Sequence, residues 1–253
     1  MKNKKSKFNK IDEKKEKINE HRPADKSVLT EIRNKLSLDL IYHSNAIEGN
    51  TLTLSETKVI LKDGITLGGK SVIEHLEAIN HKEAIEYLED IIANNEKLSE
   101  RQIKQLHYLI LKSIDNDNAG RYRTRNVLIE GAEHRPPNHI VVAEQMEELI
   151  NWYNGEGSEL HPVERAAKLH AEFVKIHPFI DGNGRTARLL LNFELMKNGY
   201  PVIIIRKEDR TGYYDSLEEY SVENNLDIFI NLIIDSLNYS LDLYLEVLEL
   251  NFK

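Results

Sequence analysis

The 253-residue sequence contains no cysteine and no long uninterrupted apolar run. Without cysteine it cannot form disulfides, thiolate zinc sites or a cysteine nucleophile, so any metal must be held by oxygen or imidazole ligands. A membrane-spanning helix needs about 18–20 consecutive, predominantly apolar residues. We therefore expect no transmembrane helix and no membrane partner.

Positive charge is also scarce, because 34 Lys and Arg face 42 Asp and Glu for a net charge of −8. Nucleic-acid binders usually present a clustered basic face, so we expect no nucleic-acid partner. Only the start of the chain is locally basic, and we expect residues 1–24, interrupted by Pro23, to form a flexible tail that is disordered or weakly helical. The alternative is an arm that docks on nucleic acid or an anionic surface. This start lacks the apolar core of a secretory signal, which indicates a cytoplasmic protein.

The remaining residues, 25–253, show mostly helical periodicity and no internal repeat. Apolar residues recur at spacings of three and four before Gly49, over residues 72–88, after Ser99, and from residue 143 to the end. Hydrophobic residues make up 40% of the chain, enough for a sizeable core. The pattern predicts one all-α domain.

One segment departs from this pattern and predicts a small β-hairpin. Two β-prone runs flank a long tip that contains Gly131, Pro136 and Pro137. The runs consist of Val127, Leu128 and Ile129, and of Ile140, Val141 and Val142.

The segment HPFIDGNGRTAR, residues 177–188, gathers the residues most suited to chemistry. Pro178 disfavours helical dihedrals at His177 and should leave this histidine at the C-terminal tip of a helix. The DGNG turn then leads into a new helix at about Gly184, whose free amide groups form an anion site. Glycines let phosphate oxygens approach the backbone closely. Ordinary turn formation is the alternative, but it accounts only for the glycines.

The charged residues of this segment suit a nucleoside triphosphate. Arg185 and Arg188 lie at i and i+3, so we expect them to project from one helix face toward phosphates. Asp181 offers an oxygen ligand for Mg²⁺, and His177 is a candidate general base. Together they point to phosphoryl or nucleotidyl transfer, although the sequence has neither a Walker A loop nor a kinase glycine loop.

These residues resemble the motif of the Fic (filamentation induced by cAMP) family, HPFx(D/E)GNGRxxR, at every fixed position. The resemblance extends to AGRYRTRNVLI, HPVERAAKLHAEFVKI and LLLNFELMKNGYP, over roughly residues 28–250. It implies a mostly helical fold and transfer of AMP from ATP to a Ser, Thr or Tyr hydroxyl of a target protein. By position, His177 resembles the base and Asp181 the Mg²⁺ (or Mn²⁺) ligand. The resemblance assigns the phosphate contacts to Gly182, Asn183, Gly184, Arg185 and Arg188, the last on the γ-phosphate.

A second stretch, SNAIEGN, places Ser44 and Glu48 one helical turn apart. It resembles the family's inhibitory motif (S/T)xxxE(G/N), here N-terminal to the core, in a helix of about residues 36–49. The resemblance implies that Glu48 pairs with Arg188 in the place of the γ-phosphate and slows the enzyme. The bland alternative is a surface polar pair with Gly49 ending the helix.

Further roles follow from the same resemblance. The hairpin would be the flap that holds the target; the alternative is a small ribbon that only completes the core. Tyr213 and Tyr214 would contact adenine; the alternative is that they are packing residues. Competing functions are removal of AMP by Glu48-assisted hydrolysis, transfer of another phosphate-containing group, and nucleotide sensing without turnover. Self-modification and a homodimer are further expectations, while the protein target is not identified.

Overall fold

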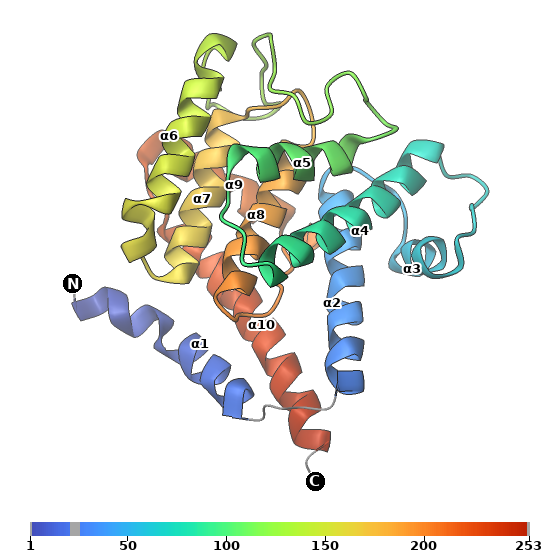
Figure 1. Cartoon of the computed structure of the whole chain (residues 1–253), viewed down its shortest axis with the longest axis vertical. Coiled ribbons are helices and arrows are strands. Elements are labelled where there is room, and N and C mark those ends of the chain that lie inside the picture. Colours follow the sequence, from blue (N-terminus) through green and yellow to red (C-terminus); the bar gives the residue numbers. More distant parts are fainter. Residues whose placement is uncertain (1, 21–25, 252–253) are drawn as a thin grey trace.

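The computed structural model describes residues 2–20 and 26–251, which contain no β-strand (Figure 1). The α-helices are α1 (Lys2–Glu20), α2 (Lys26–Ile47), α3 (Leu54–Asp63), α4 (Val72–Ala93), α5 (Glu100–Leu111), α6 (Val142–Asn154), α7 (Pro162–Ile176), α8 (Asn183–Lys197), α9 (Arg210–Glu223) and α10 (Asp227–Asn251). Three short 3₁₀ turns join them: η1 (His139–Val141), η2 (Glu156–Glu159) and η3 (Lys207–Asp209). The all-α expectation is confirmed.

Helix α8 lies in the middle of the bundle, with α7 packed along it (Figure 1). Leu189 and Leu190 belong to one hydrophobic core cluster, whereas Leu191 and Leu195 belong to the other. A helix that is buried all round needs no polar face, which explains the apolar run that follows the motif. The motif arginines are therefore anchored in the core.

Local sequence signals determine where α3 and α4 begin. Thr53 and Glu56 form a capping box at α3, as their spacing predicts, and Ser71 and Glu74 form another at α4. Each box satisfies free amide groups at a helix start. These caps fix the first turns of the two helices that follow α2 along the chain.

The expectation of a flexible tail is wrong for residues 2–20, which form α1. This helix lies against α10 (Figure 1). Phe8 and Ile11 are buried at one helical turn's spacing, and Lys7 and Lys14 form ion pairs with α10. A narrow apolar stripe among many lysines was enough to dock the helix. Pro23 and residues 21–25 lie outside the described part of the chain.

The expected β-hairpin is also wrong. Val127, Leu128 and Ile129 lie in a loop, Ile140 and Val141 lie in η1, and Val142 opens α6. Pro136 and Pro137 cannot donate to a strand ladder, and the Asn138 side chain accepts the Ile140 amide to start a helical turn. The residues that directly precede the two runs are joined by a side-chain hydrogen bond, in which Asn126 Oδ1 accepts the His139 amide at 2.9 Å.

Helix α10 is, by length and composition, apolar enough over Asp227–Leu248 to cross a membrane. In this fold it packs against α1, α2, α7 and α9. Phe229, Ile233, Leu237 and Leu241 are buried in a core cluster. Packing therefore accounts for these four apolar side chains.

Candidate functional site

The motif loop joins the C-terminus of α7 to the N-terminus of α8. His177 ends α7 in the left-handed conformation, with φ 51°, and Gly182 precedes α8 with φ 75°. The Asn183 side chain bonds both the Phe179 amide and its carbonyl, at 2.9 and 3.0 Å. This pair of bonds closes the loop and leaves the first amides of α8 facing the space beside His177. The sequence predicted both helix ends correctly.

His107, a buried histidine on α5, supports the motif loop, and the sequence analysis did not identify it. The Gly120 amide donates to His107 Nδ1 at 2.9 Å, so Nε2 carries the proton and donates to the Asp181 carbonyl at 2.8 Å. The His107 ring stacks on Phe179, with centroids 3.6 Å apart. Burial lowers the pKa of His107 to about 4, which keeps it neutral. Its place in a helical apolar pattern gave no sign of this role.

Arg123 is a second support that the sequence did not single out. Its Nε donates to the His177 carbonyl at 2.9 Å, and its amide donates to the Pro178 carbonyl at 2.9 Å. The same guanidinium donates to the Pro137 carbonyl at 2.5 Å. Arg123 thus fixes the loop of residues 124–137 next to His177. The fragment AGRYRTR was the only available signal.

His177 lines a cavity of about 460 Å³, together with Glu48, Gly184 and Tyr214. Loop residues 129–132 and His134 form another wall of this cavity. Burial lowers the pKa of His177 to about 4. A histidine with that pKa is neutral at pH 7 and can accept a proton.

The two motif arginines have different acidic partners. Arg185 donates to Glu77 at 2.8 Å and to Asp181 at 3.2 Å, whereas Arg188 donates to Glu48 Oε1 at 2.7 Å. We expected both to project into one space, and Glu77 was missed because it comes from α4, distant in sequence. The second contact, between Arg188 and Glu48, is the one that the sequence resemblance implied.

Arg188 is 1% exposed and has further partners. It donates to the Ser44 hydroxyl at 2.9 Å, to the Ser44 carbonyl at 2.8 Å and to the Tyr213 hydroxyl at 3.4 Å. Burial by itself would lower the pKa of Arg188, but Glu48 and Tyr213 reverse this and raise it. Ser44 and Glu48 therefore hold a buried, permanently charged guanidinium between them.

The Glu48 carboxylate lies directly over the first turn of α8. A Cβ atom added at Gly184 would be 2.3 Å from Glu48 Oε1, so a larger residue there would force the Glu48 side chain to move. Arg210 Nε donates to the Ile47 carbonyl at 2.9 Å and holds the end of α2 in this place. An anion thus already occupies the amide end of α8.

The two tyrosines differ in exposure. Tyr213 is 1% exposed, and its hydroxyl bonds His170 Nε2 at 3.0 Å as well as Arg188. Tyr214 is 37% exposed, and the Arg210 guanidinium lies over its ring. Tyr213 is thus a buried support, and Tyr214 is the one whose ring a ligand can reach.

Asp181 is the residue available for a cation. Its side chain is 65% exposed at the tip of the motif loop, 3.2 Å from Arg185. Among the described residues, no three His, Asp or Glu side chains gather as a metal cluster. A single carboxylate suits Mg²⁺ only where bound phosphates supply further ligands, because Mg²⁺ commonly takes one or two carboxylates plus substrate phosphates.

Comparison with known proteins gives a consistent result. The Fic/DOC family model matches residues 97–195. The chain is 39% identical over 220 residues to Protein adenylyltransferase Fic of Drosophila willistoni, covering 87% of this chain and 44% of the relative. The relative of that name from Nematostella vectensis is 39% identical, covering 94% of this chain and 55% of the relative. The chain thus spans about half the length of these curated relatives.

Solved structures share the whole fold. Fic-1 (residues 134–508) from C. elegans superimposes with a TM-score of 0.89 at 31% identity, covering 98% of this chain and 73% of the other. A Fic domain containing signaling protein from Bacteroides thetaiotaomicron gives a TM-score of 0.88 at 33% identity, covering 94% of this chain and 96% of the other. This chain belongs to the Fic/DOC family.

Proposed function

We propose that this protein transfers AMP from ATP to a hydroxyl side chain of a target protein. The observation that carries the proposal is a neutral histidine beside the amide end of a buried helix whose first turns supply two buried arginines. The naming of relatives at 39% identity as protein adenylyltransferases supports it. ATP is the substrate that such transfer requires.

The residues account for each part of the reaction. The target hydroxyl attacks the α-phosphorus of ATP, its proton passes to His177, and the bond to pyrophosphate breaks as the new P–O bond forms. The amides of Gly182, Asn183 and Gly184 face the phosphates, and Arg185 and Arg188 neutralise the leaving group. Asp181 would hold Mg²⁺ or Mn²⁺, which would offset charge on the phosphate oxygens.

Autoinhibition forms part of the proposal. Glu48 Oε1 bonds Arg188 and lies against Gly184, where the terminal phosphate would have to be. Two negative groups cannot share one arginine at that distance without a large cost. Glu48 must therefore move before ATP can bind in a productive position.

We propose the segment of residues 127–142 as the docking segment for the target, in place of the expected hairpin flap. Leu128 is 79% exposed and Ile140 is 77% exposed, and both lie on this segment, whose residues 129–132 line the cavity. Exposed apolar side chains on a segment fixed next to the base suit protein binding. The proposal includes self-modification and a homodimer.

One experiment separates the proposal from two of its rivals, hydrolysis and nucleotide sensing. The protein is incubated with Mg²⁺ and ATP labelled in the α-phosphate, as wild type, Glu48→Gly and His177→Ala. We expect Glu48→Gly to label itself and added proteins well above wild type, and His177→Ala to label nothing. Release of AMP from a modified protein that needs Glu48 would favour hydrolysis instead. ATP binding by all three variants without any labelling would favour a sensing module.

A further inference from the structure

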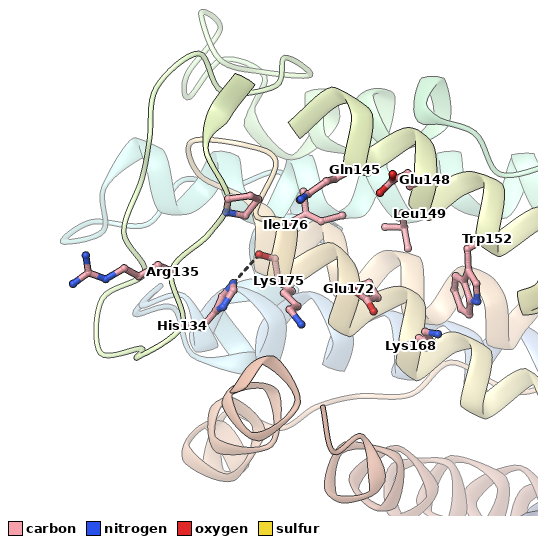
Figure 2. Close-up of a pocket in the computed structure, with 11 residues that line it drawn as sticks. His134, Arg135, Gln145, Glu148, Leu149, Trp152, Lys168, Glu172, Lys175 and Ile176 are labelled. Atoms are coloured by element: carbon pink, nitrogen blue, oxygen red, sulfur yellow. Dashed lines mark hydrogen bonds between the residues drawn. The ribbon is translucent and has the colours of Figure 1, made fainter. Parts of the chain in front are cut away.

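A second cavity, of about 480 Å³, lies between α6 and α7 and is also lined by His134, Arg135 and Pro137. Figure 2 shows its walls, with Glu148, Leu149 and Trp152 on α6 and Lys168 and Glu172 on α7. We call this cavity the α6–α7 groove. No step of the proposed reaction uses it.

The α6–α7 groove adjoins the cavity that contains His177, because His134 lines both. The His134 amide donates to Glu218 at 2.7 Å, and its Nε2 hydrogen bonds the Lys175 carbonyl at 2.9 Å (Figure 2). A polypeptide that crosses His134 therefore passes from one cavity into the other.

The length of the α6–α7 groove suits an extended segment. Lys175 and Ile176, at one end, directly precede His177, and Lys168 lies at the other end. Nine helical steps separate Lys168 from His177, about 13 Å along the axis. An extended chain covers that distance with about four residues.

The floor of the groove is apolar. Leu149 is 5% exposed and Ile176 is 6% exposed, and both line the groove together with Trp152, the only tryptophan of the chain. Such a floor favours an apolar or aromatic side chain.

The α7 wall carries two ammonium groups that lie over aromatic rings. Lys168 Nζ is 4.6 Å from the Trp152 ring centroid, and Lys175 Nζ is 5.5 Å from that of Tyr220. Neither forms a salt bridge with a carboxylate in the described part of the chain. Of the two groove carboxylates, Glu172 accepts the Tyr220 hydroxyl and Glu148 lies on the α6 side. The α7 wall thus carries two ammonium groups without a carboxylate partner among the described residues, and the one carboxylate on the same wall is bonded by the Tyr220 hydroxyl.

We propose that the α6–α7 groove binds the part of the target that flanks the modified hydroxyl, as an extended segment with an apolar residue next to an acidic one. The apolar side chain packs on Leu149, Ile176 and Trp152, and the carboxylate faces Lys168 and Lys175. This inference rests on the proposed function, because it places the hydroxyl at His177. It names the class of target sequence that the site accepts.

Binding is tested first, with a random peptide-display library as the probe and the full chain as the bait. We expect enriched peptides to combine an apolar residue with Asp or Glu within a few positions. Because Trp152 is the only indole, its fluorescence emission should change when these peptides bind. Lys168→Glu combined with Lys175→Glu should weaken binding at least about fivefold, since like charges then face each other.

Lys197→Glu is the matched control, because its ammonium also lies over a ring, that of Phe193, outside the groove. The inference is overturned if the library yields no enrichment or yields basic peptides. It is also overturned if Trp152 emission does not respond, or if the groove variants bind like Lys197→Glu.

A transfer assay then separates this inference from the proposed function. An enriched peptide is fused to a carrier protein beside a threonine and offered to Glu48→Gly with labelled ATP. We expect the groove variants, made in that background, to raise KM for the fusion and to leave kcat unchanged. If AMP is transferred with the same KM, the groove inference fails and the proposed function stands. If peptides bind as expected but nothing is ever labelled, the proposed function fails and the groove remains a binding site.

Discussion

The pair formed by Glu48 and Arg188 should stabilise the whole fold as well as close the site. The perturbation is Glu48→Gly, Arg188→Ala and both changes together. Arg188 is 1% exposed, whereas the Glu48 side chain in the pair is 28% exposed. The two single changes therefore strand very different groups.

The magnitudes follow from what each change leaves behind. Glu48→Gly strands a buried guanidinium, which keeps its bonds to the Ser44 hydroxyl and carbonyl. We expect a cost of about 2 kcal/mol, between the roughly 1 kcal/mol of an exposed pair and the about 3–5 kcal/mol of a fully stranded buried charge. Arg188→Ala should cost about 3–5 kcal/mol, because it also leaves the Ser44 groups without their donor.

The double variant gives the decisive number. Once Arg188 is gone, Glu48 can turn toward water, so removing it should then cost little. The coupling energy should therefore be about 1–2 kcal/mol, measured by urea denaturation as a double-mutant cycle. AMP transfer is measured on the same samples, and only Glu48→Gly should be active.

Strict additivity together with an active double variant would refute the reasoning. It would mean that the two side chains neither support each other nor share a site. A coupling energy without activation by Glu48→Gly would keep the structural pair and remove its inhibitory role.

Three other changes test separate parts of the site. His177→Ala should abolish AMP transfer, because a base acts on the attacking hydroxyl, while ATP affinity measured by calorimetry stays within about a few-fold of the wild-type value. An equal loss of AMP transfer and of ATP affinity would show that His177 has a structural role only. Gly184→Ala places a Cβ 2.3 Å from Glu48 Oε1. It should cost about 1–3 kcal/mol of unfolding free energy in the wild type but less in the Glu48→Gly background, where that carboxylate is absent. An equal cost in both backgrounds would contradict the placement of Glu48. Burial lowers the folded-state pKa of His107 and of His177 to about 4, so the unfolded chain binds protons at a higher pH than the folded one. The free energy of unfolding should therefore be full above about pH 6.5 and fall by about 3 kcal/mol per histidine as the pH drops toward 4. Denaturation midpoints that stay constant from pH 7 to 5 would show that these side chains are solvated.

The motif loop could be predicted because its signals are local. Pro178 and the DGNG turn determine where α7 ends and α8 begins, whatever surrounds them. The contact between Glu48 and Arg188, by contrast, joins residues 140 positions apart. It was available only through resemblance to a family motif, since spacing alone cannot bring two distant segments together.

The remaining features depend on tertiary packing. His107, Arg123 and Glu77 support the loop through contacts from other helices and loops, and no periodicity marks such residues. Helix α1 was missed because its lysines dominate the composition, although Phe8 and Ile11 decide its docking. The hairpin prediction was wrong because Pro136 and Pro137, which were expected in its tip, cannot donate to a strand ladder beside the second run.

The left-handed backbone at His177 means that the residue best suited to accept a proton is not the residue that gives the most stable fold. A helix that ends with positive φ favours glycine, and any residue with a Cβ costs about 1–2 kcal/mol more there. Replacing His177 with glycine should therefore yield a more stable protein without its proton acceptor. A design procedure or a selection that rewarded thermal stability alone would remove this histidine early, and a homologue with glycine at that position would retain the fold and lose the proposed reaction.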